Sequence, residues 1–149
     1  MYESEFPLDD SIIYLNHAAV SPWPLRTAEA VKNFADENVA VGSRNYPTWV
    51  ATESTLRQQL QQLINAASSD EIALLKNTSE ALSVVAYGLP WKSGDNVVIT
   101  SQEFPSNRAV WESLQKYGVT TRAANITAGD SPETAILDAL DDHTRLLSV

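Results

Sequence analysis

Short apolar runs alternate with amphipathic stretches along the second half of the chain. Each apolar run has the length of a strand, and continuous runs of this kind are typical of strands buried in a parallel sheet. The predicted strands are residues 72–75, 97–100, 119–124 and 146–149. The predicted helices between them are residues 79–89, residues 106–117 with Gly118 placed to cap the end, and a helix that starts at Ser131 and Pro132. In the helix at residues 106–117, one side is expected to carry Val110, Trp111, Leu114 and Tyr117. This alternation predicts right-handed crossovers and a mainly parallel sheet, which is an α/β fold.

The first part of the chain reads as an irregular arm followed by two helices. The first helix is predicted from residue 24 to about residue 45, with Pro24 suited to its first turn and its stop expected near Gly42. The second has its apolar residues on one face, at helical spacing, and we expect that face to be packed. These apolar residues are Leu56, Leu60, Leu63 and Ile64. We therefore expect an N-terminal arm and helices at residues 1–66 and an α/β domain at residues 67–149.

The last apolar run reaches the final residue, Val149, without a turn or a polar tail. We expect the natural chain to continue past this point. In that case the sheet lacks strands, and the two N-terminal helices lack the partners that would cover them. An exposed sheet edge and uncovered apolar faces favour association, so we expect the isolated chain to be poorly soluble or to associate.

Composition and charge exclude several classes of function. The chain has 19 acidic and 10 basic residues, a net charge of −9, and its basic residues form no run, so nucleic-acid binding has no electrostatic basis. Cysteine is absent, and the two histidines, His17 and His143, are far apart, which argues against a zinc site. No stretch approaches the roughly 20 apolar residues of a membrane-spanning helix. The start of the chain is acidic and polar rather than basic and then apolar, and we expect a cytoplasmic protein.

A strand-to-helix junction at Thr78 and Ser79 has the chemistry of an anion site. The amide groups at the start of a helix are free, and neighbouring hydroxyl groups add donors for phosphate oxygens. Asn77 and Glu80 also form a capping pair that needs no ligand, and the two interpretations are compatible. The segment is neither a glycine-rich Walker loop nor a dinucleotide-binding turn.

Two further segments carry candidate ligand-binding side chains. After the second predicted strand, Phe104 could lie against a ring-shaped ligand; alternatively, it packs under its loop while Ser106 caps the next helix. Near the start of the chain, His17 and Ala18 lie in a segment of small residues that could approach a ligand, although taken alone this segment reads as a plain loop.

Taken together and in this order, the three segments resemble the class V aminotransferases of the fold-type I pyridoxal 5'-phosphate (PLP) enzymes. This group includes cysteine desulfurases, selenocysteine lyases and isopenicillin-N-epimerase-like proteins. The resemblance runs from Tyr14-Leu15-Asn16-His17-Ala18-Ala19 through Asn77-Thr78-Ser79-Glu80 and Gly94-Asp95-Asn96-Val97-Val98-Ile99 to Glu103-Phe104-Pro105-Ser106-Asn107. It implies an incomplete three-layer α/β/α large domain, a homodimer and an amino-acid substrate.

The resemblance also implies roles for individual residues. Thr78 and Ser79 match the pair that binds the cofactor phosphate, Phe104 matches the residue that stacks on the ring, and His17 and Ala18 match the loop that approaches the substrate. Many family members carry histidine where this chain has Phe104, so proton transfer by that residue is not expected here.

The family's Schiff-base lysine is expected beyond the end of this chain. None of the four lysines matches it, so we expect no catalytic residue within these 149 residues and no activity from the chain alone. The lysines are Lys32, Lys76, Lys92 and Lys116. Desulfuration, lyase chemistry, transamination and epimerisation all remain open. The alternative is a non-catalytic α/β domain that binds a small phosphorylated ligand or a protein partner.

Overall fold

The computed structural model describes residues 2–18 and 20–149 of the chain. The chain divides into two compact units, Met1–Ile72 and Ala73–Val149. The first unit is helical, and the second contains the strands of a sheet.

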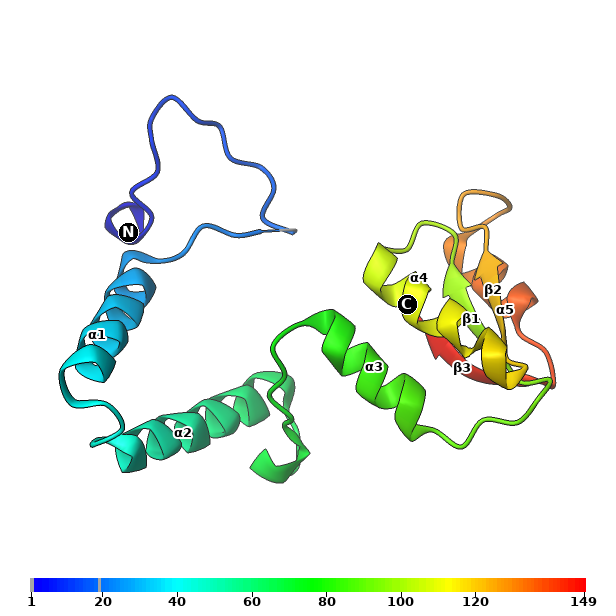
Figure 1. The fold of residues 1–149 in the computed structure, drawn as a ribbon. Coiled ribbons are helices and arrows are strands. Elements are labelled where there is room, and N and C mark those ends of the chain that lie inside the picture. Colours follow the sequence, from blue (N-terminus) through cyan, green and yellow to red (C-terminus); the bar gives the residue numbers. More distant parts are fainter. Residues whose placement is uncertain (1, 19) are drawn as a thin grey trace. The chain divides into compact units, whose positions relative to one another are not determined.

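The first unit consists of helices joined by turns and an irregular arm (Figure 1). It contains a short 3-10 helix at Glu3–Glu5, α1 at Leu25–Val41, α2 at Tyr46–Ile64 and a second 3-10 helix at Ser69–Glu71. A hydrogen bond from the Trp49 indole N–H to Glu37 Oε1, at 2.9 Å, joins α2 to α1. The Trp49 ring also meets the ring of Phe34 edge-on, with centroids 5.2 Å apart. These contacts hold the two helices together at the turn between them.

Helix α1 ends at the glycine where the sequence predicts its stop. It ends at Val41, because Gly42 takes a positive φ of 59° and its N–H bonds the Asn38 carbonyl. The expectation that the apolar face of α2 is packed is wrong within the described chain. Leu63 and Ile64 are 79% and 65% exposed, and no residue of α2 is buried. Amphipathic spacing forms this helix, but no apolar element of its own unit covers that face.

The second unit is an α/β domain with a parallel sheet. Its elements in chain order are α3 at Thr78–Gly88, β1 at Asn96–Thr100, α4 at Pro105–Glu112, a 3-10 helix at Ser113–Tyr117, β2 at Thr120–Ala124, α5 at Pro132–Ala139 and β3 at Thr144–Ser148. The three strands of the described residues lie in the order β2-β1-β3. The α/β class and the parallel sheet expected from the sequence are therefore confirmed.

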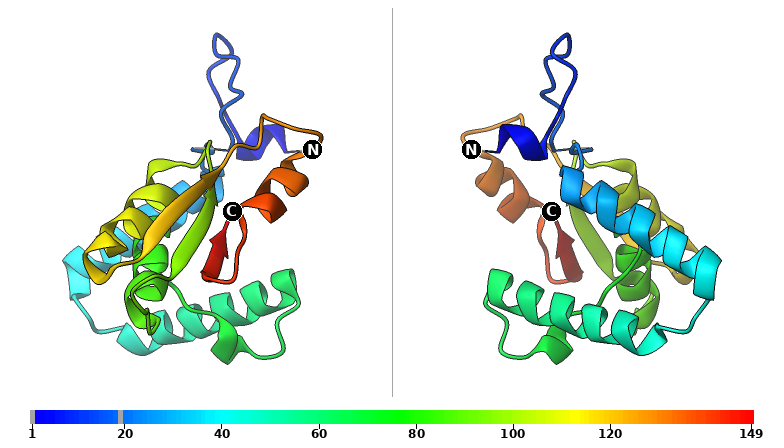
Figure 2. Two further views of the ribbon diagram at one scale, coloured as in Figure 1. Left: turned by 90° about the vertical axis from the view of Figure 1, so that its right-hand side faces the viewer. Right: turned by 90° about the vertical axis from the view of Figure 1, so that its left-hand side faces the viewer.

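Helices cover both faces of this sheet. In Figure 2, α4 and α5 lie on opposite sides of the strands, and both contact β1 and β2. The core lies on the α4 side, where Val97 and Ile99 of β1 pack with Trp111 and Leu114. Val98, between them in sequence, is also fully buried. Because side chains alternate along a strand, the central strand contributes to both layers of packing.

One predicted strand is absent from the second unit. Residues 72–75 are apolar enough for a buried strand, but they follow the 3-10 helix Ser69–Glu71 and form no ladder. A strand needs a neighbour for its backbone N–H and C=O groups. None of the strands in the described part of the chain pairs with this segment. The Ile72 carbonyl instead accepts a hydrogen bond from the Arg57 guanidinium.

The amino-terminal ends of β1 and β3 are joined through Asp141. Its carboxylate accepts hydrogen bonds from the Asn96 amide at 2.7 Å and from the His143 backbone N–H at 2.9 Å, and it pairs with Arg122 of β2. The hydrogen bond from Asn96, opposed by burial and supported by His143 and Arg122, holds the pKa of Asp141 below its ordinary value. The carboxylate therefore links the first residue of β1 and the turn before β3 to the middle of β2.

Candidate functional site

The start of α3 is capped by its own neighbours. The Glu80 N–H donates to Asn77 Oδ1 at 2.9 Å, so Asn77 is the N-cap. In return, Glu80 Oε2 accepts from the Lys76 N–H at 2.9 Å. The capping pair expected from the sequence is therefore confirmed. It uses only one of the first-turn amides of α3 and leaves the others to a ligand.

Thr78 and Ser79 are the first two residues of α3, and both are exposed. Among the side-chain hydrogen bonds of the described residues, none uses the hydroxyl of either residue, although the Ser79 carbonyl accepts from Ser83 Oγ at 2.7 Å. Their two N–H groups precede the first intrahelical bond, from the Ala81 N–H to the Asn77 carbonyl. Hydroxyl and amide donors at the positive end of a helix dipole are suited to a phosphate.

Phe104 lies at the start of α4, directly after the loop that leaves β1. It is the N-cap residue of α4, with Pro105 as the first helical residue, and its ring is 74% exposed. The loop before it is held by a 3.0 Å hydrogen bond from the Thr100 hydroxyl to Glu103 Oε1. The ring is not packed under its loop, so one face is available to a ligand. The alternative in which Ser106 caps this helix is wrong, since Ser106 lies inside the first turn and no side-chain cap bond forms.

Side chains of α3 and α4 line a groove that connects the two helix starts. The helices run side by side in the same direction, because Ser79 and Ser106 line one part of the groove while Tyr87 and Ser113 meet at 2.8 Å further along. The hydrogen bond with Ser113, supported by the nearby Lys116, lowers the pKa of Tyr87. The free donors of α3 and α4 therefore gather at one end of this groove, and sequence reasoning missed the contribution of Ser106 to it.

His17 and Ala18 belong to the first unit, and both are exposed. The His17 ring meets the Tyr14 ring edge-on, with centroids 5.2 Å apart, and the His17 carbonyl accepts from Ser21 Oγ at 3.0 Å. His17 also lines a hollow together with Phe6, Leu8, Ser21, Pro22 and Pro24. These contacts fold the loop on itself and leave the imidazole nitrogens free of them. The other candidate residues, Thr78, Ser79 and Phe104, lie in the second unit.

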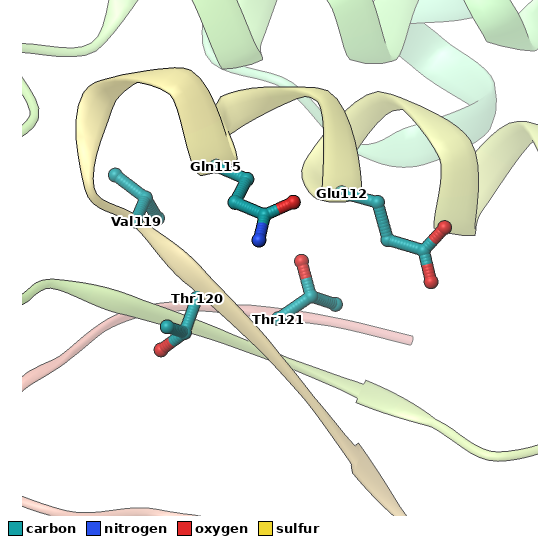
Figure 3. Close-up of a pocket in the computed structure, with 5 residues that line it drawn as sticks. All are labelled: Glu112, Gln115, Val119, Thr120 and Thr121. Carbon is teal, nitrogen blue, oxygen red and sulfur yellow. The ribbon is translucent and has the colours of Figure 1, made fainter.

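A second hollow lies between the end of α4 and strand β2 (Figure 3). Glu112, Gln115, Val119, Thr120 and Thr121 line it, and Thr121 Oγ1 is buried without a partner among the described residues. Its one charged group, Glu112, is paired with Arg108 at 2.7 Å. A carboxylate at the wall disfavours an anionic ligand, so this hollow does not suit a phosphate.

The described residues offer neither a metal centre nor a membrane span. Within residues 2–18 and 20–149, no group of three or more His, Asp or Glu side chains is placed to hold a metal ion. In the same part of the chain, no helix has both the length and the apolar character needed to cross a bilayer.

Comparison with known proteins gives consistent matches. The family model for aminotransferase class V matches residues 13–149. A probable cysteine desulfurase of Methanothermobacter thermautotrophicus is 36% identical over 97% of this chain and 37% of its own length. A cysteine desulfurase of Yersinia pestis is 32% identical over 98% of this chain and 40% of its own length. The chain thus spans less than half of the length of these relatives.

Solved structures show the same fold. A C-DES mutant with glycine covalently linked to its PLP cofactor superposes with a TM-score of 0.82 over 97% of this chain and 39% of its own, at 24% identity. A cysteine desulfurase of Escherichia coli gives a TM-score of 0.77 over 98% of this chain and 39% of its own, at 23% identity. The family match over residues 13–149 and the relatives above 30% identity lead to one conclusion: this chain belongs to the class V aminotransferase family.

Proposed function

We propose that this chain is the N-terminal part of a PLP-dependent enzyme that acts on an amino acid. The observation that carries the proposal is the pair of free hydroxyl and amide donors of Thr78 and Ser79 at the start of α3. The family membership and the PLP bound by the similar C-DES protein support the same cofactor.

The donor set at the start of α3 fits a phosphate group. A phosphate offers acceptors only, and Thr78 and Ser79 present fixed donors through their N–H groups and flexible donors through their hydroxyls. The Glu80 carboxylate, which would repel an anion, accepts a hydrogen bond from the Lys76 N–H. Thr78 and Ser79 would therefore hold the cofactor by its phosphate, and the bound cofactor would supply an electron sink for carbanion chemistry.

Phe104 would cover the cofactor ring and exclude water from one face. Its side chain is largely exposed at the start of α4, and a phenyl face stacks on an aromatic ring without any polar group. A phenyl group has no titratable proton, so Phe104 cannot transfer a proton to or from the substrate. Any acid–base step near this position needs a group supplied from elsewhere.

The proposal also covers the class of substrate and the oligomeric state of the enzyme. Relatives are named cysteine desulfurases, which favours a sulfur-containing amino acid such as cysteine, with His17 and Ala18 near it. A homodimer and a cytoplasmic location also stay predictions. The other reactions compatible with this proposal are transamination, lyase chemistry and epimerisation of an amino acid.

The test is binding of deoxypyridoxine phosphate, a cofactor analogue without the aldehyde, by the protein purified from its host and then freed of its bound cofactor. The analogue cannot react with lysines, so its affinity reports the phosphate and ring contacts alone. Thr78→Ala combined with Ser79→Ala should weaken binding by about ten- to a hundredfold, because each removes a hydrogen bond to a charged group. The control is Ser83→Ala, one turn further along α3, whose hydroxyl bonds the Ser79 carbonyl. Unchanged affinity in the double variant would overturn the proposal.

A further inference from the structure

Asn107, in the first turn of α4, is hydrogen-bonded on both sides of its amide group. Its Oδ1 accepts from the Trp111 indole N–H at 2.9 Å and from the Ser148 hydroxyl. Its Nδ2 donates to the Ser148 carbonyl at 3.4 Å. The Asn107 backbone N–H donates to the Phe104 carbonyl at 2.9 Å. One residue thus connects the candidate ring-covering residue, Phe104, to the sheet.

The partners of the Asn107 side chain belong to the packed part of the second unit. Trp111 is 1% exposed and lies in the core. Ser148 is the last residue of β3 and pairs in register with Ile99 of β1, which is buried. A buried indole N–H needs an acceptor, and the acceptor that it finds also fixes the direction of the Asn107 side chain. Asn107 therefore holds the start of α4 to the carboxyl end of β3.

The start of α4 has few other constraints. Phe104 is the N-cap but makes no side-chain cap bond, and Pro105 has no N–H to donate. The ring of Phe104 is 74% exposed, so its direction follows from its own backbone rather than from packing. The loop bond between Thr100 and Glu103 ends one residue before it. If this backbone were released, a ligand would have to order the ring on binding, which costs affinity.

An amide suits the link to β3 better than other polar groups do. Asn107 accepts from the hydroxyl of Ser148 and donates to its carbonyl, so one planar group pairs with both polar groups of one residue. A carboxylate in its place could not donate to that carbonyl, and a hydroxyl is too short to reach the same partners.

We propose that Asn107 is a positioning residue for the cofactor ring: by joining α4 to the end of β3, it holds Phe104 in the orientation that covers the ring. The inference rests on the proposed function and adds to it a residue that acts through another. Supporting hydrogen bonds of this kind keep a binding side chain close to its productive geometry.

The experiment uses the protein purified from its host and freed of its bound cofactor. Calorimetry measures binding of deoxypyridoxine phosphate, of unphosphorylated deoxypyridoxine and of inorganic phosphate. Asn107→Ala should weaken both ring compounds by about three- to tenfold, because stacking is impaired, and leave inorganic phosphate unchanged. Added to Phe104→Ala, it should cause no further loss. The control is Arg108→Gln, which removes the exposed ion pair with Glu112 from the same helix and should change none of the three affinities.

A second pair of variants tests the same link from the strand. Ser148→Ala removes one hydroxyl and keeps the bond between Asn107 and Trp111, so the buried indole stays paired even if Asn107→Ala fails to fold. It should weaken both ring compounds by about two- to fivefold. Ser148→Thr restores a hydroxyl and should restore the affinity.

Two outcomes would overturn the inference. Unchanged binding of both ring compounds in Ser148→Ala and in Asn107→Ala, with weakened binding in Phe104→Ala, would show that Phe104 keeps its position without this link, and the proposed function would stand. A further loss when Asn107→Ala is added to Phe104→Ala, or an equal loss for inorganic phosphate, would show that Asn107 acts on the fold as a whole rather than through Phe104.

Discussion

Hydroxyl groups near the start of α3 differ in what they bind. Ser83 satisfies its hydroxyl on the Ser79 carbonyl, as serines inside helices commonly do. Thr78 and Ser79 are the first two residues of the helix, and no preceding helical turn offers their hydroxyls a backbone carbonyl as acceptor. The same residue type is therefore structural in one turn and available to a ligand in the preceding turn.

Replacing Phe104 separates ring stacking from proton chemistry. Phe104→Ala should weaken binding of deoxypyridoxine phosphate by about tenfold, since it removes an aromatic face worth about 1 kcal/mol beyond the area it covers. Phe104→Tyr should retain the affinity because it keeps the face. Fluorescence titration of the analogue measures both. Equal affinity in Phe104→Ala would show that this ring does not contact the cofactor.

The carboxylate of Asp141 should make stability depend on pH. Its pKa in the folded protein is lowered, so its stabilising effect is present above the ordinary value of 3.8 and is lost as the pH falls below it. Asp141→Asn should therefore lower the urea midpoint at pH 7, and its difference from the unaltered protein should shrink toward pH 3. The matched control is Asp142→Asn, which removes an equal charge from the neighbouring residue. A difference that stays constant with pH would contradict this role.

At the scale of elements, the turn at Gly118 joins the 3-10 helix Ser113–Tyr117 to β2. Gly118 has φ of 77°, and a Cβ there would lie 2.5 Å from Ser93 Oγ. Gly118→Ala should therefore destabilise the domain by about 2 kcal/mol or more. Gly88→Ala is the control, because nothing lies within 4 Å of a Cβ at that position. Urea unfolding of both variants measures the difference, and equal stabilities would contradict the assigned contact.

Local patterns predicted most elements of the α/β domain, but not what covers them. Val110, Trp111 and Leu114 were placed correctly on one inward face, and all are buried. Tyr117, expected on the same face, is 51% exposed, because the last turn tightens into a 3-10 helix. The strand at residues 72–75 failed for another reason: a strand depends on a distant partner, and periodicity carries no information about that partner.

In the candidate site, too, local features could be predicted from the sequence, whereas features that depend on packing between distant segments could not. The cap at Asn77 and the helix start at Thr78 are local and were predicted from a few residues. The groove that brings Ser106 beside Ser79 depends on how two helices pack, and the sequence placed Ser106 only as a cap. Helix packing depends on side chains far apart in the chain, so a linear motif does not reveal it.

At the scale of the whole molecule, burial is uneven between the two units. Within residues 2–18 and 20–72, Ile72 is the one buried apolar side chain, whereas the second unit has a contiguous core around Trp111 and Ile99. Amides of α1 and α2 should therefore exchange with solvent faster than those of β1, because few apolar contacts oppose local opening. Hydrogen-exchange mass spectrometry measures this, and slower exchange in α1 than in β1 would contradict it.

Exposed apolar side chains should also make these 149 residues associate when they are prepared alone. Leu63, Val39 and Ile13 are each at least 79% exposed, and many other large apolar residues are exposed too. Size-exclusion chromatography should show species larger than the 16.3 kDa chain, or loss of protein from solution. A monomer with a single sharp unfolding transition would contradict this expectation.

The most direct test of the central claim, that this chain is part of a PLP enzyme, is mass spectrometry of the protein purified from its host after borohydride reduction. Reduction fixes a Schiff-base cofactor to its lysine, so the modified residue can be located. The predicted result is one PLP group on a lysine other than Lys32, Lys76, Lys92 and Lys116, in a species heavier than 16.3 kDa. A 16.3 kDa protein without PLP would contradict the claim and favour a phosphate-binding domain without catalysis.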